Sequence, residues 1–211
     1  MWWMLAAVAI SGSATDLTFN PENLDTKTLR TLAERGTSII VDSDATGALK
    51  LVTAGIVVNA PPQAVFDTAM DFSHFPEFMP QVESAKVDID AADHKNVQLG
   101  LKFKFSVIST SMKYTERVTW SAPERITFQF IEGDLTKGGG SYRMLPIDGG
   151  SRTLLFYSTI SDLRSTGFLT RTLIKEQPPM EAAIQVSTAS VVAQAIKKRA
   201  ESKTSTTAAA R

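Results

Sequence analysis

The chain has 211 residues, of which 43% are hydrophobic, and its 22 lysines and arginines balance its 22 aspartates and glutamates. This length and composition are typical of one globular domain with short appendages. Because the net charge is zero, no strong positive field is available to hold a polyphosphate backbone, and we expect no nucleic-acid partner. The absence of cysteine excludes disulfides, thiolate catalysis and cysteine-ligated metals.

Residues 1–14, MWWMLAAVAISGSA, have the pattern of a signal peptide. An apolar run from Trp2 to Ile10 precedes small residues that end at Ala14, and this run is shorter than the roughly 20 residues of a membrane-spanning helix. No lysine or arginine precedes the run, so only the amino terminus supplies positive charge. We expect export to the periplasm or the exterior. The alternatives are a retained anchor and a frayed or mis-started terminus.

A short helix and a hairpin are predicted next. Residues 25–35 carry leucines at helical spacing, and Gly36 follows as a stop signal. Two β-branched runs, 38–42 and 49–59, are joined by a polar turn that contains Gly47. These runs predict two antiparallel strands.

Two further helical segments follow the hairpin. Residues 63–72 place large apolar side chains on one side at helical spacing, and Pro62 suits the first turn of a helix. Residues 73–80 combine two prolines with three large apolar side chains, which is typical of a packed turn of helix that ends at Pro80.

Beyond residue 82 apolar and polar residues alternate with a period of two. Residues 97–107 show this most clearly and predict a strand with one face exposed to water. Further strands are predicted over 112–120, 126–130, 141–147 and 152–160, and the glycine run 138–140 is interpreted as one of the turns between them. Together these strands form an antiparallel meander.

A long helix is predicted after Pro178-Pro179, over residues 180–199, and many of its side chains are small. Because no other segment is left to cover the apolar face of the meander, this helix has to do so. The predicted fold class is α+β, a helix-grip fold with a curved antiparallel sheet wrapped around a long C-terminal helix. The expected organisation is a signal peptide at 1–14, one domain at 15–200 and a disordered tail at 201–211.

Two segments carry a resemblance to a known family. The segment Gly55–Phe66, GIVVNAPPQAVF, and the segment Asp71–Pro80, DFSHFPEFMP, together with the element order, resemble the START-like (SRPBCC) superfamily in its polyketide cyclase and coenzyme-Q-binding (COQ10-like) branch. The likeness in element order extends over 55–199. It implies a deep cavity between sheet and helix that holds a lipid, quinone, sterol or polyketide. The superfamily includes carriers, cyclases and regulatory domains.

The residues themselves also favour a cavity. The predicted terminal helix presents small side chains to a sheet rich in phenylalanine, so that unfilled volume remains between them. The alternative is that Trp120 and Phe128 fill this volume and that the small residues only allow the helix to approach closely.

Glu116 is the strongest polar candidate for the cavity. It falls on the apolar side of its strand between Tyr114 and Val118, and a buried carboxylate needs a partner or a ligand. A bulge that turns Glu116 to water is the alternative. Tyr142 or Arg143 could approach Glu116 if register and curvature allow.

The ligand-binding set that we predict has a polar and an apolar part. The polar candidates are Glu116, Tyr114, Tyr142 and Arg143, and the apolar wall is expected from Phe103, Phe105, Phe128, Met180 and Ile184. The inward stripe of the terminal helix is expected to include Ala183.

No catalytic, metal or cofactor site is predicted. The histidines, His74 and His94, have no recognisable metal-ligand spacing. A calcium-loop pattern that starts at Asp88 lacks its glycine and has Leu99 where the bidentate glutamate belongs. The glycine run 138–140 lacks the Lys-Ser/Thr of a phosphate-binding loop.

The sequence therefore predicts a non-catalytic protein that binds or transports a hydrophobic small molecule, such as a lipid, quinone or sterol-like compound, with transient membrane contact as an option. One alternative is a polyketide aromatase/cyclase, in which the same pocket would also support turnover. Another is a regulatory interaction module of the same fold, which would need a cytoplasmic or organellar location.

Overall fold

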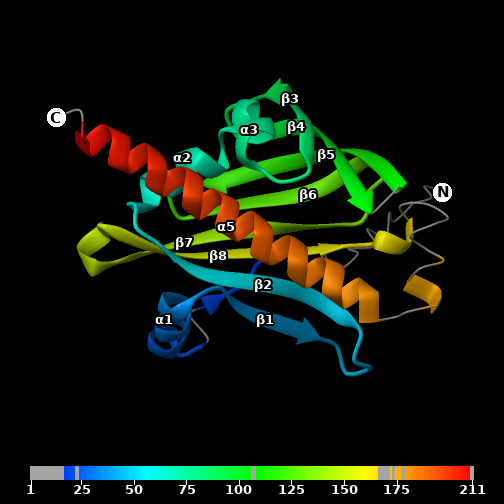
Figure 1. The fold of residues 1–211 in the computed structure, drawn as a ribbon, viewed down its shortest axis with the longest axis horizontal. Helices are drawn as coiled ribbons and strands as arrows, with labels where there is room; N and C mark the ends of the chain where they lie inside the picture. Colours follow the sequence, from blue (N-terminus) through cyan, green and yellow to red (C-terminus); the bar gives the residue numbers. More distant parts are fainter. Residues whose placement is uncertain are drawn as a thin grey trace, which may run out of the picture.

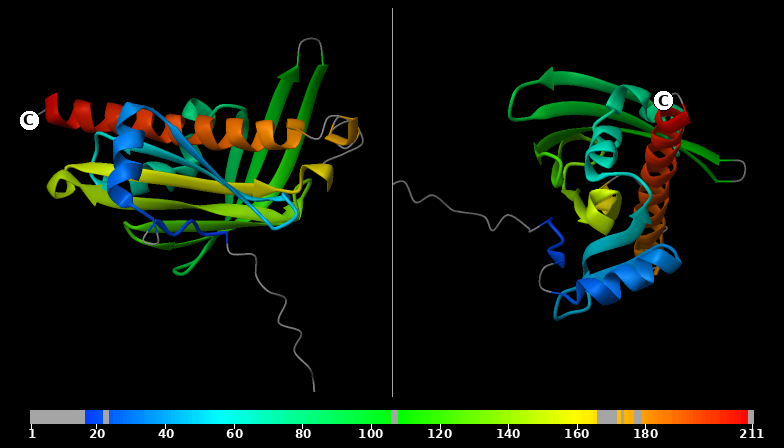
Figure 2. Two further views of the ribbon diagram at one scale, coloured as in Figure 1. Left: turned by 90° about the horizontal axis from the view of Figure 1, so that it is seen from below. Right: turned by 90° about the vertical axis from the view of Figure 1, so that its left-hand side faces the viewer.

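The computed structural model describes residues 17–21, 24–105, 108–165, 172, 174–176 and 179–209. The predicted signal peptide at 1–14 lies outside the described residues, so export stays a prediction. Within the described chain, one eight-stranded antiparallel sheet curves around a long helix, α5 (Pro179–Ala209) (Figures 1 and 2). The predicted helix-grip fold is confirmed.

The strand order in the sheet is β1-β2-β8-β7-β6-β5-β4-β3. Neighbours from β3 to β8 are consecutive in sequence, and the first hairpin joins the meander through β2 and β8. The bounds are β1 (Ser38–Ser43), β2 (Leu49–Val58), β3 (Val82–Asp90), β4 (Lys95–Phe105), β5 (Ile108–Ser121), β6 (Arg125–Gly133), β7 (Gly138–Ile147) and β8 (Arg152–Ser161).

The shorter helices begin and end where local signals predict. Asp25 caps α1 (Thr26–Arg35) by accepting hydrogen bonds from the Lys27 and Thr28 amides, and Gly36 follows the helix. Pro62 opens the next helix, where a missing N–H costs nothing. The remaining bounds are α2 (Pro62–Ala69), η2 (Phe72–His74), α3 (Phe75–Phe78), η3 (Asp148–Gly150) and η4 (Leu163–Ser165).

The sheet buries side chains on both faces where β2 and β8 pair. The larger core lies between the concave face and the helices α2, α3 and α5. A smaller cluster on the opposite face joins Ala33 of α1 to Val57, Leu154 and Phe156. Both faces are covered here, which explains why β2 and β8 are buried along nearly their whole length.

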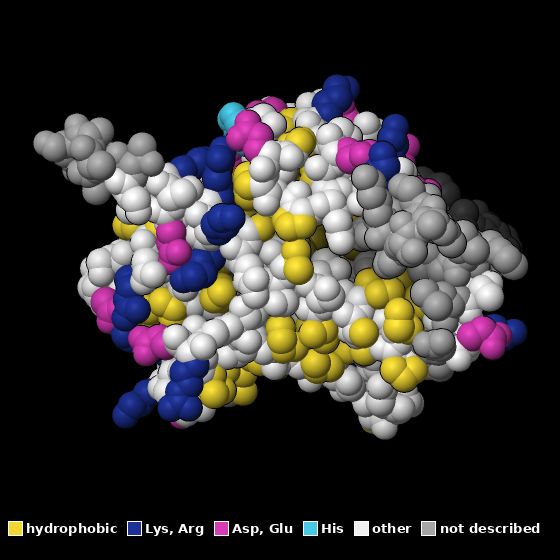
Figure 3. Space-filling view, in the orientation of Figure 1, with side chains coloured by type: hydrophobic (Ala, Val, Ile, Leu, Met, Phe, Trp, Pro, Cys, Tyr) yellow, Lys and Arg dark blue, Asp and Glu magenta, His cyan; other side chains and the backbone are white. Residues whose placement is uncertain are grey.

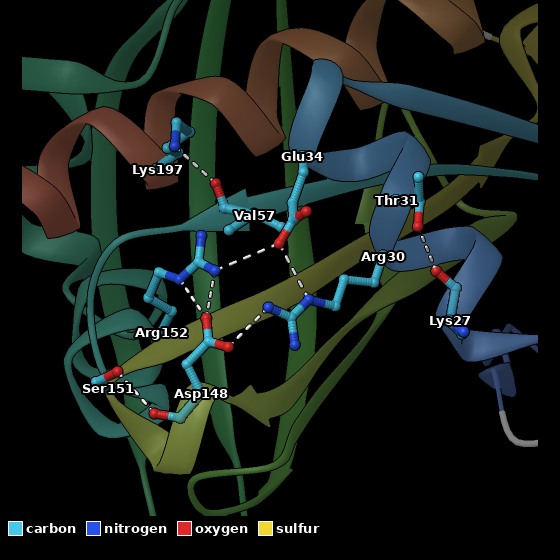
Figure 4. A network of polar contacts seen from close by, with 9 residues as sticks. All are labelled: Lys27, Arg30, Thr31, Glu34, Val57, Asp148, Ser151, Arg152 and Lys197. Atoms are coloured by element: carbon cyan, nitrogen blue, oxygen red, sulfur yellow. Dashed lines mark hydrogen bonds and ion pairs between the residues drawn. The ribbon is translucent and has the colours of Figure 1, made fainter.

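An ion-pair network fixes α1 to the turn between β7 and β8 (Figure 4). The Arg30 guanidinium lies 3.0 Å from Glu34 and 2.7 Å from Asp148, and Arg152 contacts both carboxylates. These side chains are about one-third exposed, so each pair contributes at most about 1 kcal/mol. The apolar contacts of Ala33 give α1 its main attachment.

The C-terminal helix starts at Pro179 as predicted but is longer than predicted. It continues to Ala209, so the expected disordered tail at 201–211 is helical over residues 201–209. Glu201 accepts a hydrogen bond from the Asn59 amide at 2.8 Å, and Lys203 lies 2.7 Å from Asp71. These tertiary contacts extend the helix, since the serines and threonines of this segment are weak helix formers. Within the described ranges, no helix has both the length and the apolar character needed to cross a membrane.

Candidate functional site

A cavity of about 140 Å³ lies between the concave face of the sheet and α5. Most of its walls are apolar and come from several strands, from the α2–α3 region and from α5; they include Phe72, Leu99, Val118, Phe128, Phe130 and Val192. An engineered protein cavity of about 150 Å³ holds benzene, so this space suits one six-membered ring. The cavity lies where the sequence predicts it.

An aromatic cluster explains why the cavity is small. Phe128 stacks on Tyr157 with ring centroids 6.0 Å apart, and Tyr142 lies 4.7 Å from Tyr157. Tyr114 meets Phe130 edge-on at 5.0 Å. These rings occupy inward positions of β5 to β8, and they fill much of the gap that the helix leaves. The filled-core alternative is therefore partly right, although a ring-sized space remains.

Glycine makes the packing of Phe128 possible. The glycine run 138–140, predicted as a turn, is instead the start of β7. A Cβ on Gly140 would lie 2.7 Å from the Phe128 ring and 1.9 Å from the Ser158 carbonyl oxygen, closer than any side chain allows. The run is therefore needed for close packing within the sheet rather than for chain reversal.

The helix α5 approaches the sheet through small residues. Its buried positions are Gln185, Ala189, Ala193, Ile196 and Ala200. The three alanines are fully buried, which allows the helix backbone to lie close to the sheet. Beside this stripe, Ile184, Thr188 and Val192 border the cavity.

Glu116 lies inside the cavity wall, as predicted. It is 7% exposed, and no described residue gives it a hydrogen bond or an ion pair. Burial raises the pKa of the carboxyl to about 8, so the group is largely protonated at neutral pH.

The register of the sheet keeps Glu116 inward. A register shift does occur beside it, between the pairs Thr115–Glu132 and Glu116–Phe130. However, the extra residue is Ile131 of β6, which is exposed, so the alternation of β5 itself is unbroken. The predicted alternative, a bulge that turns Glu116 to water, is wrong.

Two tyrosines share the cavity wall with Glu116. Tyr114 and Tyr142 both line the cavity, and no described residue forms a hydrogen bond with either hydroxyl. Burial, and secondarily nearby acidic groups that include Glu116, hold the pKa of both phenols well above the usual value. Both hydroxyls therefore remain neutral hydrogen-bond donors.

The structure brings five of the predicted residues together. Glu116, Tyr114, Tyr142, Phe128 and Ile184 line the cavity. The side chains of Phe103 and Phe105 lie outside what the structure describes, so their role stays a prediction.

Arg143 and Met180 are not among the cavity-lining residues, and Ala183 is not on the inward stripe. Arg143 follows Tyr142 in a strand, so it faces the other side of the sheet, where it lies 3.4 Å from Glu124. Met180, one turn before Ile184 in α5, is half-buried outside the cavity lining. Ala183 is exposed, because the buried stripe begins at Gln185.

Sequence reasoning missed a polar edge of the cavity. Thr159 and Ser161 of β8 and Thr188 of α5 line it. Buried Gln185 donates a hydrogen bond to the Ser161 carbonyl oxygen at 2.7 Å and fixes this part of α5 to β8. The available signal was the alternation Tyr157, Thr159, Ser161, which places three polar residues on one face of β8.

Charged groups that could bind a metal are not gathered anywhere in the described ranges. There, no three His, Cys, Asp or Glu side chains lie close enough to hold an ion. His74 lies on the surface, where it pairs with Asp71 at 2.5 Å.

The family described as "Polyketide cyclase / dehydrase and lipid transport" matches residues 58–178, more than half of the chain. The match does not single out the coenzyme-Q-binding branch, which stays a prediction. No curated protein sequence matches the chain significantly.

Solved structures share the fold at low sequence identity. A protein from Thermus thermophilus is 18% identical, with a TM-score of 0.59 over 72% of this chain and 98% of that one. The Zhui aromatase/cyclase from Streptomyces sp. R1128 is 15% identical, with a TM-score of 0.53 over 72% of this chain and 93% of that one. A STAR-related lipid transfer protein fragment from Xanthomonas axonopodis is 14% identical, with a TM-score of 0.52 over 77% of this chain and 98% of that one.

Proposed function

Since the chain belongs to the polyketide cyclase/dehydrase and lipid transport family, we propose that it carries a hydrophobic small molecule, without converting it, in the cavity between its sheet and α5. The observation that carries this proposal is an apolar cavity with an unpartnered buried carboxyl, Glu116, in its wall. Burial of the ligand would supply the affinity, at about 2.5 kcal/mol for each 100 Å² of apolar surface. The few polar groups would supply the specificity.

A second candidate function is that of an aromatase/cyclase. It is favoured by the buried position of Glu116 in the cavity wall, because burial raises the pKa of this carboxyl to about 8, and an acid with a pKa near the working pH can both give and take a proton. This candidate requires turnover of a polyketide substrate, whereas the carrier releases its ligand unchanged.

Native mass spectrometry of freshly purified protein tests the carrier proposal. We expect a mass adduct that solvent extraction removes and that has the mass of an unmodified lipid-like compound. Ligand-free protein after gentle purification from its native host, or recovery of a compound that the protein converts on incubation, would contradict the proposal.

We also propose that the protein is exported and meets membranes only transiently. The signal-peptide pattern of residues 1–14 supports export, and the proposed ligand class, which partitions into bilayers, supports membrane contact. N-terminal sequencing of protein from its native host should begin near Thr15. An intact Met1 on protein in the cytoplasmic fraction would contradict export.

A further inference from the structure

The wall of the cavity offers hydrogen-bond donors that no described protein group uses. Glu116 of β5, Tyr114 two residues before it and Tyr142 of β7 all line the cavity. None of their side chains has a hydrogen-bond partner among the described residues. Buried polar groups are normally satisfied, so these three point to a ligand that completes them.

The same wall offers nothing to an anion. Among the described residues that line the cavity there is no lysine, arginine or histidine. The titratable groups there are Glu116 of β5, Tyr114 of β5, Tyr142 of β7 and Tyr157 of β8; the lining residues of β4, β6 and α5 are not titratable. A carboxylate or phosphate placed here would be buried without a counter-charge, which is strongly unfavourable.

The size of the cavity limits what can enter. A volume of about 140 Å³ accepts one ring, so the buried part of the ligand is ring-sized. Phe128, Phe130 and Tyr157 supply flat apolar surfaces for such a ring.

We infer that the buried end of the ligand is an uncharged, ring-sized group with a carbonyl oxygen, which accepts hydrogen bonds from protonated Glu116 and from the hydroxyls of Tyr114 and Tyr142. This inference rests on the proposed function and assigns its ligand class. Anionic lipids such as free fatty acids are excluded from the buried end. An ammonium ligand is the competing chemistry, because it would pair with ionised Glu116 and with the aromatic faces.

The two chemistries give opposite pH dependences. A carbonyl needs Glu116 protonated, so its affinity falls as pH rises through the pKa of about 8. An ammonium needs Glu116 ionised, so its affinity rises over the same range. Between pH 7 and pH 9 the protonated fraction falls about tenfold, and the affinity for a carbonyl falls with it.

Three probes of one size test the inference: acetophenone, 1-phenylethylamine and benzoate, titrated calorimetrically into the full chain, cleared of bound lipid, at pH 7 and pH 9. We expect acetophenone to bind most tightly at pH 7 and about tenfold more weakly at pH 9. Glu116→Gln cannot titrate, so its affinity for acetophenone should be the same at pH 7 and at pH 9. Glu132→Gln, which changes an exposed carboxyl on β6, should behave as the unmodified chain.

The outcomes separate the inference from the proposed function. Tighter binding of the amine or of benzoate, or an affinity for acetophenone that does not fall with pH, overturns the carbonyl assignment and leaves the carrier function standing. If none of the three probes binds and no lipid co-purifies, both the assignment and the carrier function are wrong.

Discussion

The two halves of α5 hold to the domain in different ways. Charged side chains attach the C-terminal half, here called the charged half, to the rest of the domain. Lys197 donates a hydrogen bond to the Val57 carbonyl oxygen at 2.6 Å, and Arg199 lies 2.9 Å from Glu77 of α3. In the N-terminal half, Glu181 of the first turn lies 3.0 Å from Arg164, and the rest of this half is uncharged and borders the cavity. In Figure 3, charged side chains gather over the C-terminal half, whereas the middle of the same face is mostly neutral and apolar.

This difference separates stability from ligand binding along one helix. The charged half fixes the helix to α3, to Asp71 between α2 and η2, and to Asn59 after β2, and none of these three residues lines the cavity. The uncharged half can then close an apolar space with small and β-branched residues. Its polar attachments include the hydrogen bonds from Gln185 to Ser161 and from Gln194 to Thr37. Substitutions in the two halves should therefore have distinct consequences.

The largest stability loss is expected from Ile196→Ala in the charged, C-terminal half of α5. Ile196 is fully buried, so its truncation leaves a cavity in a packed core and should cost about 2–5 kcal/mol. Urea denaturation measures this loss. Lys198→Ala, at an exposed position two residues later, is the matched control and should change stability by less than about 0.5 kcal/mol.

Glu116→Gln should stabilise the domain at neutral pH. The folded pKa of about 8 lies above the usual value of 4.5, so the folded state keeps a proton that the unfolded state loses. Stability therefore falls as pH rises between these two values, and by pH 7 the loss is about 3 kcal/mol. A glutamine side chain at this position cannot titrate, so this slope should vanish.

Chemical denaturation from pH 4 to pH 9 checks this prediction, with Glu132→Gln as control. If the stability of Glu116→Gln depended on pH as strongly as that of the unmodified chain, Glu116 would not be the source of the slope, and its burial would have little effect on stability.

A smaller stability loss is expected when an ion pair of the charged half is removed. Lys203 lies 2.7 Å from Asp71, and its side chain is 45% exposed. Lys203→Ala should lower stability by about 0.5 kcal/mol, and 1 M salt should reduce the difference between the two proteins. A loss that salt does not change would show that the aliphatic part of Lys203, rather than its charge, holds the helix.

Strand alternation made much of the site predictable. It placed Tyr114, Glu116 and Phe128 on the inward face, and the structure confirms these positions. The same rule excludes Arg143 once Tyr142 faces inward, so the prediction that both residues reach the cavity is inconsistent with strand alternation.

The sequence could not show in the same way which side of α5 is buried. Small residues surround the helix, so no apolar stripe distinguishes its buried side, and the prediction that Ala183 faces inward is wrong. The extension of the helix to Ala209 depends on contacts with Asn59 and Asp71, which lie far away in sequence. Both features are set by tertiary packing.

The most direct test of the account is ligand occupancy after a ring is added to the uncharged half of α5. Val192→Phe places a ring in the cavity, whereas Ala183→Phe adds the same ring on the exposed side of the helix. Native mass spectrometry should show the co-purifying ligand lost from the first variant and retained by the second, with both melting within a few degrees of the unmodified chain. Full occupancy in Val192→Phe would contradict the account, because the ligand would then be bound somewhere other than this cavity.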